Sequence, residues 1–358
     1  MRTSDFDYAL PPTLIAQRPA PVRDQSRLLL LRRENGLINH RHFPDLVKEL
    51  QAGDVLVLND SRVIPARLRG ANGKTHGAFE ILLLEENAPN DWWVMLRPGR
   101  RARIGTEIIF KNGSGTLTNV FATVVAKNDE GHRRLEFAGT ANIAEEISTL
   151  GEVPLPPYIT RNSSQDLADD QERYQTVYAE TNGSIAAPTA GLHFTPDLLE
   201  TIRNRGVNVC FVTLHVGLGT FAPVKTETLS GHKMHTESFA INDDTAKIIN
   251  EAKRNGHRVI AVGTTTVRVL ESVAAQNGGQ LVAGNARTSI FIYPPYSFRI
   301  VDGLVTNFHL PRSTLLMLVC AFASPGQTSG RDLVLTAYAE AVRQQYRFYS
   351  YGDAMLIV

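Results

Sequence analysis

The sequence predicts an α/β protein that carries a separate all-β unit. Three observations support this prediction: short apolar runs separated by turn residues over 55–137, a proline-rich stretch at 151–159, and alternating strand and helix patterns after that stretch. A chain of 358 residues is long enough for about two or three domains, and we start from two. Its hydrophobic content of 43% allows a large buried core.

The elements before the proline-rich stretch are expected to be strands. An apolar run at 27–31 predicts the first strand. The all-β unit follows as short runs bounded by Gly, Asn, Asp and Pro, at 55–58, 81–84, 93–96, 107–110, 121–125 and 134–137. The stretch GEVPLPPYI (151–159) contains three prolines, which disfavour a regular helix, so we expect an extended connector there.

After the connector, helices alternate with strands. Thr195 as N-cap, Pro196 at the first helical position and Gly206 behind the last turn predict a helix over 196–205. The next expected elements are a strand at 207–214, a helix at 244–255, a strand at 258–262, a helix at 265–276 and a helix opening at 313. This alternation implies a largely parallel sheet.

The two ends of the chain bear on how the all-β unit is connected. An apolar run at 354–358 predicts a last buried strand that closes the main domain. If the strand at 27–31 joins the same sheet, the chain leaves that sheet, forms the all-β unit and returns. The all-β unit is then an insertion.

Whole-chain charge does not indicate a nucleic-acid binder. The formal net charge is only +1, whereas proteins that contact many phosphates usually carry a basic excess. Any RNA contact must therefore be local. The candidate is the turn LRPGRRARIGT (96–106), with Arg97, Arg100, Arg101 and Arg103. The alternative is a solvated arginine-rich turn without a partner.

The N-terminus and the cysteines favour a cytoplasmic protein. Charges at Arg2, Asp5 and Asp7 leave no apolar run that resembles a signal peptide. No stretch approaches the roughly 18 apolar residues that span a bilayer, so we expect no membrane partner. Cys210 and Cys320 lie in apolar runs, where lone cysteines usually act as small core residues.

Two polar segments follow predicted strands, where α/β proteins gather functional groups. In GDVLVLNDSRVIPARL (53–68), an apolar strand runs into Asn59, Asp60 and Arg62, which could instead form only a turn. In APTAGLHFT (187–195), His193 and Phe194 precede the capped helix. A histidine there can act as a base, a hydrogen-bond donor or a structural cap.

Two segments with glycines and histidines come next. HVGLGTF (215–221) holds His215, Gly217 and Gly219 but lacks the third glycine of a dinucleotide fingerprint, so we expect its backbone amides to approach a ligand. The segment GHKMHTES (231–238) holds His232, Lys233, His235 and Glu237. The two histidines have no third ligand at metal spacing, which argues against a zinc site. We favour a polar loop that contacts the substrate.

Two helix-opening segments complete the set. In VGTTTVRVLES (262–272), Gly263, Thr264 and Thr265 open a helix whose free amides suit a carboxylate or phosphate, with Arg268 one turn later. Simple threonine capping is the alternative. In TNFHLPRSTLLMLV (306–319), a strand ends at Asn307, Phe308 and His309. The sequence contains no P-loop, dinucleotide fingerprint, G-x-S-x-G or zinc framework.

These segments, in this order, resemble the tRNA ribosyltransferase-isomerase family of queuosine biosynthesis. The resemblance begins with DFDYALPPTLIAQ (5–17) and ends with YRFYSYGDAMLI (346–357), so it covers almost the whole chain. It implies a barrel-like α/β core with a small inserted β-barrel. The expected boundaries are 1–61 and 153–358 for the core and 62–152 for the inserted barrel.

The resemblance also implies an enzyme. Members of this family transfer and rearrange the ribosyl part of S-adenosylmethionine onto 7-aminomethyl-7-deazaguanine at the wobble position of tRNA with a GUN anticodon. The products are epoxyqueuosine-tRNA, adenine and methionine. S-adenosylmethionine is then a cosubstrate, and no cofactor or metal is expected. We expect a monomer.

Such a reaction needs proton acceptors, an anion site and stacking surfaces. A sulfonium acidifies the neighbouring C5′ protons, and the candidate bases are His193, His215, His235 and Glu237. Asp60 or His309 can accept a proton from the attacking aminomethyl group. The methionine carboxylate suits Thr264, Thr265 and Arg268, and a base can stack on Phe194, Phe221 or Phe308. Further substrate-contacting candidates are Asn59, Arg62, Gly217, Gly219, Thr220, Lys233, Gly263 and Asn307.

The inserted barrel would then act as an arm on tRNA, with Arg97, Arg100, Arg101 and Arg103 on its backbone. Two other function classes stay open. One is a noncatalytic tRNA- or nucleoside-binding protein, which would release no adenine. The other is a metal-dependent hydrolase built on His193, His215, His232 and His235.

Overall fold

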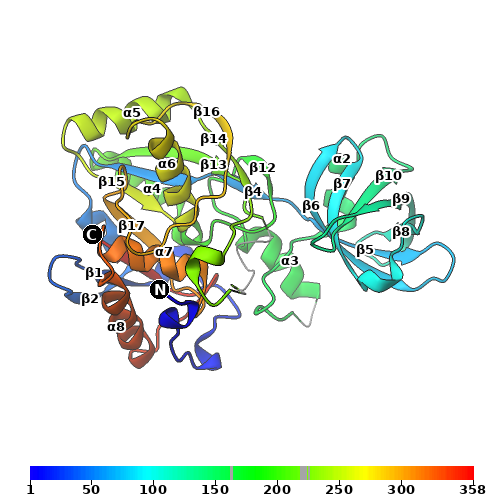
Figure 1. Cartoon of the computed structure of the whole chain (residues 1–358), viewed down its shortest axis with the longest axis horizontal. Helices are drawn as coiled ribbons and strands as arrows, with labels where there is room; N and C mark the ends of the chain where they lie inside the picture. Colours follow the sequence, from blue (N-terminus) through cyan, green and yellow to red (C-terminus); the bar gives the residue numbers. More distant parts are fainter. Residues whose placement is uncertain (162–163, 218–223, 225) are drawn as a thin grey trace.

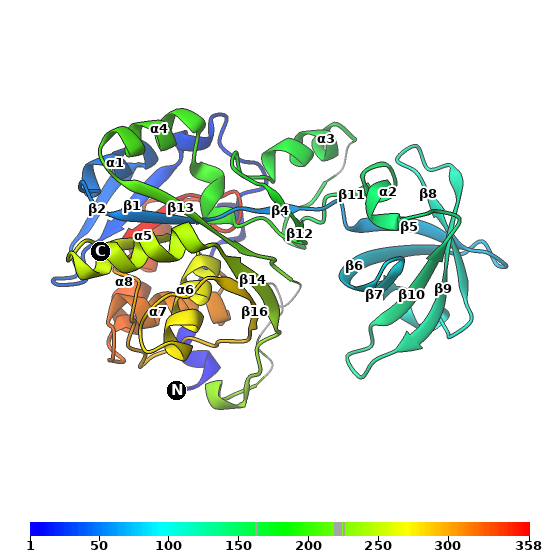
Figure 2. The same cartoon turned by 90° about the horizontal axis from the view of Figure 1, so that it is seen from above.

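A computed structural model describes residues 1–161, 164–217, 224 and 226–358, without the side chains of 164–168. Figures 1 and 2 show two lobes, an α/β core and a β-barrel beside it. Both chain ends lie in the core. Among the described helices, none is long and apolar enough to cross a bilayer.

A nine-stranded mixed sheet forms the centre of the core. Its strands, in spatial order, are β16 (Gly284–Thr288), β14 (Glu237–Ile241), β13 (Asn208–Leu214), β3 (Val55–Asn59), β15 (Val259–Val262), β17 (Gly303–Asn307), β18 (Ala354–Ile357), β1 (Arg27–Leu31) and β2 (Ile38–His42). The predicted strands at 27–31 and 354–358 are therefore confirmed, and they pair in parallel.

Parallel pairing is concentrated in the middle of this sheet. Strands β13, β3, β15 and β17 run parallel to one another. Toward the edges, β13–β14, β14–β16, β17–β18 and β1–β2 pair antiparallel. The prediction of a largely parallel sheet thus holds for the centre and is wrong for these four outer pairs, although β18 and β1 pair in parallel.

Helices cover both faces of the sheet. They are α1 (Leu46–Glu49), α4 (Pro196–Asn204), α5 (Asp243–Arg254), α6 (Thr264–Gln276), α7 (Thr314–Ala323) and α8 (Gly330–Arg343). In β3, Val55 and Val57 pack in the same cluster as α5 to α8, whereas Leu56 and Leu58 pack with α1 and α4. This alternation follows from the two-residue period of a strand. The predicted helices at 196–205, 244–255 and 265–276 are confirmed within one residue.

The second lobe is a closed barrel with its own apolar core. Its strands, in spatial order, are β5 (Arg67–Asn72), β6 (Ala78–Ala88), β7 (Asp91–Arg97), β10 (Arg133–Ala138), β9 (Leu117–Lys127) and β8 (Glu107–Lys111). Pairing of β5 with β8 closes it. Helix α2 (Ile143–Leu150) packs into its core. Since β1 and β3 belong to the core sheet, the barrel is an insertion, as predicted. The run at 55–58, predicted as the first strand of the all-β unit, is instead β3 of the core.

Two connections join the lobes. On the way out, β4 (Ser61–Val63) pairs in parallel with β12 (Thr181–Ser184) beside the core. On the way back, β11 (Gly151–Glu152) pairs with β5, and residues 153–161 form neither helix nor strand. Helix α3 (Ser164–Arg173) follows. The boundaries at 61/62 and 152/153 stay a prediction.

Candidate functional site

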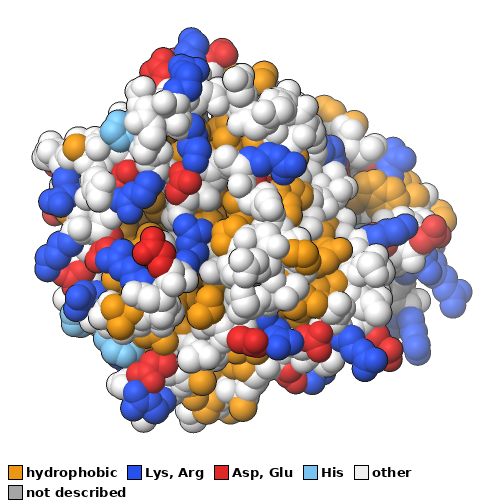
Figure 3. All heavy atoms as spheres, turned by 60° about the vertical axis from the view of Figure 1, so that its left-hand side comes forward, with side chains coloured by type: hydrophobic (Ala, Val, Ile, Leu, Met, Phe, Trp, Pro, Cys, Tyr) orange, Lys and Arg blue, Asp and Glu red, His pale blue; other side chains and the backbone are white. Residues whose placement is uncertain are grey.

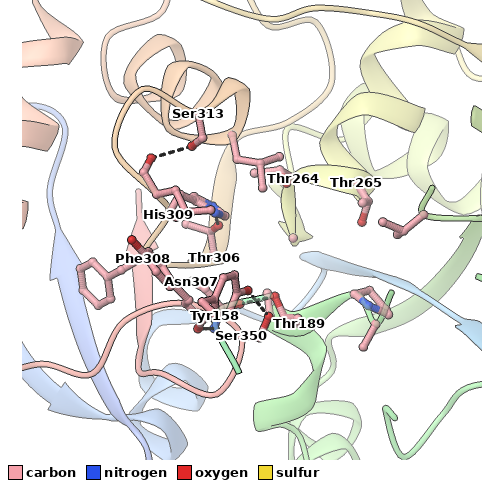
Figure 4. A pocket seen from close by; sticks show the side chains of 18 residues that line it. Tyr158, Thr189, Thr264, Thr265, Thr306, Asn307, Phe308, His309, Ser313 and Ser350 are labelled. Atoms are coloured by element: carbon pink, nitrogen blue, oxygen red, sulfur yellow. Dashed lines mark hydrogen bonds between the residues drawn. The ribbon is translucent and has the colours of Figure 1, made fainter. Parts of the chain in front are cut away.

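A pocket opens where the central parallel strands end. Residues that follow β13, β15 and β17 line it, together with the first residues of α6 and α7 and the 3-10 turn Thr189–His193 (Figure 4). The lining residues are Tyr158, Ala187, Pro188, Thr189, Ala190, Val216, Gly263, Thr264, Thr265, Thr306, Asn307, Phe308, His309, Leu310, Ser313, Leu315, Tyr349 and Ser350. This is the sheet edge at which the sequence predicts functional groups.

The start of α6 supplies one wall. Gly263 has a φ of +86°, a left-handed conformation that favours glycine, and it donates its amide to Val305 across 2.8 Å. Thr264 and Thr265 follow in the first helical turn, where backbone amides lack intrahelical partners. Asn59 donates to the Thr265 hydroxyl at 3.3 Å and so fixes it from β3. The wall suits an anionic group.

The end of β17 supplies a second wall with a neutral histidine. His309 Nε2 lies 2.8 Å from the Thr306 hydroxyl. Burial lowers the pKa of His309 to about 3, so its imidazole is uncharged at pH 7. The Phe308 ring packs among Tyr338, Tyr346 and Phe348 and is turned away from the pocket in Figure 4. Stacking of a substrate base on Phe308 is therefore not supported.

His193 lies behind this wall, with both ring nitrogens engaged. Asn307 Nδ2 is 3.2 Å from Nε2, and the Ser26 hydroxyl is 2.8 Å from Nδ1. Thr189 donates to Asn307 Oδ1 at 3.0 Å, which fixes the amide and makes Nδ2 the donor. Burial lowers the pKa of His193 to about 3. The geometry is that of a neutral histidine that positions Asn307.

A second polar group lies at the neighbouring ends of β3 and β13. The His215 Nδ1 is 2.8 Å from the Ser61 hydroxyl, and its half-buried ring has a pKa below the usual value because of burial. Asp60 accepts a hydrogen bond from the Thr213 hydroxyl at 2.6 Å. Burial nevertheless raises the Asp60 pKa, with Glu180 adding to the effect. Both groups can accept a proton near neutral pH.

Glu237 and Arg268 form an ion pair inside the core. Their side chains are 6% and 3% exposed, and Arg268 Nη1 donates to Glu237 Oε2. Glu237 Oε1 accepts the amide of Gly217 at 3.1 Å. Arg268 is thus paired with a carboxylate of the protein, and neither side chain lines the pocket. The predicted contact of Arg268 with a substrate carboxylate stays a prediction, with the guanidinium paired to Glu237 in this structure.

Several predicted contacts are not gathered at the pocket. Phe194 is fully buried and packs edge-on against Phe43, so its ring is not open to a base. The Arg62 guanidinium donates to the Ala179 carbonyl. Lys233 and His235 are exposed on the segment before β14. Gly219, Thr220 and Phe221 lie outside the described residues.

The arginine turn, residues 97–103, projects from the barrel. Arg97, Arg100, Arg101 and Arg103 are all exposed, and no ion pair to them occurs among the described residues. Arg133, itself buried, donates to the carbonyls of Gly99 and Ala102, each at 2.8 Å, and so holds the turn. Figure 3 shows a contrasting core face on which cationic and anionic side chains are interspersed.

Sequence reasoning missed the hydroxyl groups on one side of the pocket. Tyr158, Thr189 and Ser350 gather there (Figure 4). Tyr158 belongs to the proline-rich connector and Ser350 to the C-terminal segment. The segment with Ser350 carries the family resemblance, but nothing in the local pattern of either segment predicts that two residues almost 200 positions apart in the chain would meet.

No group of three or more His, Cys, Asp or Glu residues that could hold a metal ion occurs in the described part of the chain. His193, His215, His232 and His235 are accordingly not assembled into a ligand set. Cys210 and Cys320 are buried and free, and burial raises the pKa of the Cys210 thiol to about 11.

Comparison with known proteins gives full-length matches. The model of a family described as queuosine biosynthesis protein matches residues 3–357. Proteins named S-adenosylmethionine:tRNA ribosyltransferase-isomerase are 52% identical in Moorella thermoacetica and 48% identical in Staphylococcus haemolyticus, each with 100% of both chains covered. A crystal structure of S-adenosylmethionine tRNA ribosyltransferase from Thermotoga maritima is 37% identical, with a TM-score of 0.53 and 99% and 100% coverage.

Proposed function

The chain belongs to the queuosine biosynthesis protein family, and we propose on that basis that it acts as an S-adenosylmethionine:tRNA ribosyltransferase-isomerase. It transfers and isomerises the ribosyl moiety of S-adenosylmethionine onto 7-aminomethyl-7-deazaguanine at the wobble position of tRNA. The observation that carries this proposal is the match to enzymes of that name along the entire chain at about half identity. We propose the pocket at the sheet edge as the site of the reaction.

We assign the proton transfers to groups beside the pocket. His215 suits the base that removes a C5′ proton, because it is neutral near pH 7 and, among the described residues, only its Nδ1 has a hydrogen-bond partner, Ser61. Asp60 suits the acceptor for the aminomethyl proton, because its raised pKa makes it a stronger base than an exposed aspartate. The exposed His235 is a weaker candidate than either.

The walls of the pocket suit the two ends of S-adenosylmethionine. The amides at the start of α6, with the Thr264 hydroxyl, suit the methionine carboxylate. The rest of the pocket has hydroxyls and a neutral His309, which suit the uncharged nucleoside end. S-adenosylmethionine is a cosubstrate in this proposal, and no further cofactor is invoked.

The tRNA partner is assigned to the barrel side of the molecule. We propose tRNA with a GUN anticodon as the substrate and the exposed arginine turn as a backbone contact. Bases of a single-stranded anticodon loop can be splayed out without melting a duplex, so a local basic patch is sufficient. We retain a monomer that acts in the cytoplasm, with the barrel spanning 62–152.

Release of adenine tests the proposal. Purified protein is mixed with S-adenosylmethionine and tRNA that carries 7-aminomethyl-7-deazaguanine, without added metal, and the products are separated by chromatography. We expect stoichiometric adenine that depends on the modified tRNA. The control is the same tRNA with guanine at the wobble position, which lacks the nucleophile.

Other outcomes point to the other two classes. Tight binding of tRNA without adenine release would contradict the transferase and favour a binding protein. Loss of activity after chelation, restored by a metal, would favour the hydrolase built on the four histidines.

A further inference from the structure

The segment that returns the chain from the barrel passes along the pocket. Gln17 accepts the Thr160 amide at 3.0 Å and donates to the Tyr158 carbonyl at 2.8 Å, which ties residues 158–160 to the N-terminal part of the core. Arg161 is paired with the buried Asp170, and the Tyr351 hydroxyl donates to the same carboxylate at 2.6 Å. The segment is therefore fixed, and Tyr158 is held at the pocket wall.

Two hydroxyl groups meet at that wall, and a third is buried behind it. The Tyr158 hydroxyl lies 2.7 Å from the Ser350 hydroxyl, and both residues line the pocket. Tyr174, at the end of α3, is 1% exposed, and its hydroxyl has no hydrogen-bond partner among the described residues. Ser350 and Ala187, two pocket residues, lie close to this hydroxyl, so Tyr174 supports the wall from inside the protein.

The neighbouring Tyr349 is held in an unusual conformation. Its φ is +69°, a region that a bulky residue seldom adopts. Its ring lies 4.8 Å from the Tyr158 ring, and its carbonyl accepts a hydrogen bond from Asn307 at 3.3 Å. Backbone strain of this kind clusters at ligand sites, where surrounding contacts enforce it. The surrounding contacts therefore hold this wall of the pocket in a defined conformation.

The chemistry of the wall selects a neutral, hydroxyl-bearing group. No Asp, Glu, Lys or Arg is among the described residues that line the pocket. Burial raises the pKa of Tyr158 to about 12 and raises that of Tyr174 further, so both phenols stay protonated. Phenol and serine hydroxyls each donate and accept, which matches the two neighbouring hydroxyls of a sugar.

We propose that Tyr158 and Ser350, with Tyr174 buried behind them, form the subsite that holds the ribose hydroxyls of the nucleoside substrate, and that Tyr158 contacts these hydroxyls directly. This inference rests on the proposed function, because that reaction requires a ribosyl group to be held while bonds to it change. It also gives the connector of the inserted barrel a direct part in the pocket.

Inhibition by substrate analogues tests the subsite. S-adenosylhomocysteine, its 2′-deoxy analogue and its 3′-deoxy analogue are compared as inhibitors of adenine release by the full-length protein. With the unsubstituted protein, we expect loss of a ribose hydroxyl to raise the inhibition constant about 5- to 10-fold for at least one deoxy analogue. With Tyr158→Phe, we expect the inhibition constant of S-adenosylhomocysteine to rise by a similar factor relative to the unsubstituted protein. For that deoxy analogue, the substitution should cause no further rise in the inhibition constant.

A matched variant and two outcomes separate the possible results. Tyr346→Phe removes a phenol hydroxyl that binds His40 away from the pocket, and it should behave like the unsubstituted protein. If Tyr158→Phe and the unsubstituted protein both release adenine and show the same ratio of inhibition constants between the deoxy analogue and S-adenosylhomocysteine, only the subsite proposal is overturned. No adenine release by the unsubstituted protein contradicts the proposed function and overturns the subsite with it.

Discussion

His193 and His215 differ in which ring nitrogens the protein occupies. Both nitrogens of His193 lie within hydrogen-bond distance of Ser26 and Asn307, whereas His215 uses Nδ1 with Ser61, and no partner of its Nε2 occurs in the described part of the chain. The His215 ring fits closely against Gly183, where an added Cβ would lie 2.8 Å from ring atoms. A base needs an available lone pair, so the geometry favours His215.

We expect His215→Asn to lower the rate of adenine release about 10²- to 10⁴-fold, because a positioned proton acceptor contributes rate of that order. Burial lowers the His215 pKa, so the imidazole stays neutral at pH 7 and is protonated only below its usual range. Activity should therefore fall as pH decreases through that lowered pKa. The measurement is kcat/KM against pH for the protein and the variant.

His76→Asn is the matched control for this experiment. His76 lies exposed in a turn with a φ of +56°, which asparagine tolerates, so activity and pH profile should not change. An acid limb that persists unchanged in His215→Asn would assign the titrating group to another residue, with Asp60 as the next candidate.

At the level of single residues, the sequence predicted which segments lie near the pocket better than it predicted where individual side chains point. Gly263, Thr264, Thr265, Asn307 and His309 are at the pocket as expected. The rings of Phe194 and Phe308 point into the core instead, because an aromatic residue in a motif fits a buried cluster as well as a ligand site. Only the chain's path in three dimensions decides between the two.

At the scale of elements, the ion pair Glu237–Arg268 joins β14 to α6. Glu237 stands at the start of β14, Arg268 in the second turn of α6, and the Gly217 amide after β13 binds the same carboxylate. β14, α6 and the segment after β13 are thus held together by one buried charge pair. Removing one partner leaves the other charge buried without compensation.

We expect Glu237→Gln to lower the free energy of unfolding by about 3–5 kcal/mol, because the Arg268 charge is left unpaired. Glu237→Gln combined with Arg268→Met should recover most of that loss, since no buried charge remains. Urea denaturation of the protein, both single variants and the double variant gives the coupling free energy. If Glu237→Gln keeps full stability and loses only adenine release, Glu237 is a proton acceptor and not a structural partner.

Element boundaries were predicted closely where local signals are strong. The cap at Thr195 and Pro196 marks the start of α4, and glycines after α4 and α5 mark their ends. The mixed direction of the outer strands was missed, because a strand's own sequence carries no information about its neighbour in the sheet. β18 shows this: it pairs in parallel with β1 and antiparallel with β17.

At the scale of the whole molecule, the barrel carries a cluster of exposed arginines, whereas the core face in Figure 3 has cationic and anionic side chains interspersed. The arginine turn lies on an inserted lobe joined to the core through β4 and residues 153–161. The lobes also meet through an ion pair between Arg287 of β16 and Glu85 of β6, with a separation of 2.7 Å. A chain of net charge +1 can therefore carry a local cationic patch on the barrel, none of whose described residues lines the pocket.

We expect Arg100→Ala combined with Arg101→Ala to raise the KM for tRNA and to leave the KM for S-adenosylmethionine unchanged. Both side chains are exposed on the barrel, and no described residue of the barrel lines the pocket. Each phosphate contact that is lost should reduce the slope of log affinity against log salt by about 0.9 for a duplex or 0.7 for a single strand. Binding of tRNA measured from low to high salt gives that slope.

The control replaces two exposed arginines of the core, Arg203 and Arg254, by alanine, so that net charge changes by the same amount. If the patch acts through direct phosphate contacts, only the barrel variant flattens the salt dependence. If both variants lower affinity equally with parallel slopes, the effect comes from overall charge and the barrel is not the arm. The buried Arg133 holds the arginine turn in place, so replacing Arg100 and Arg101 should leave the barrel folded. The comparison then separates the loss of phosphate contacts from any loss of stability.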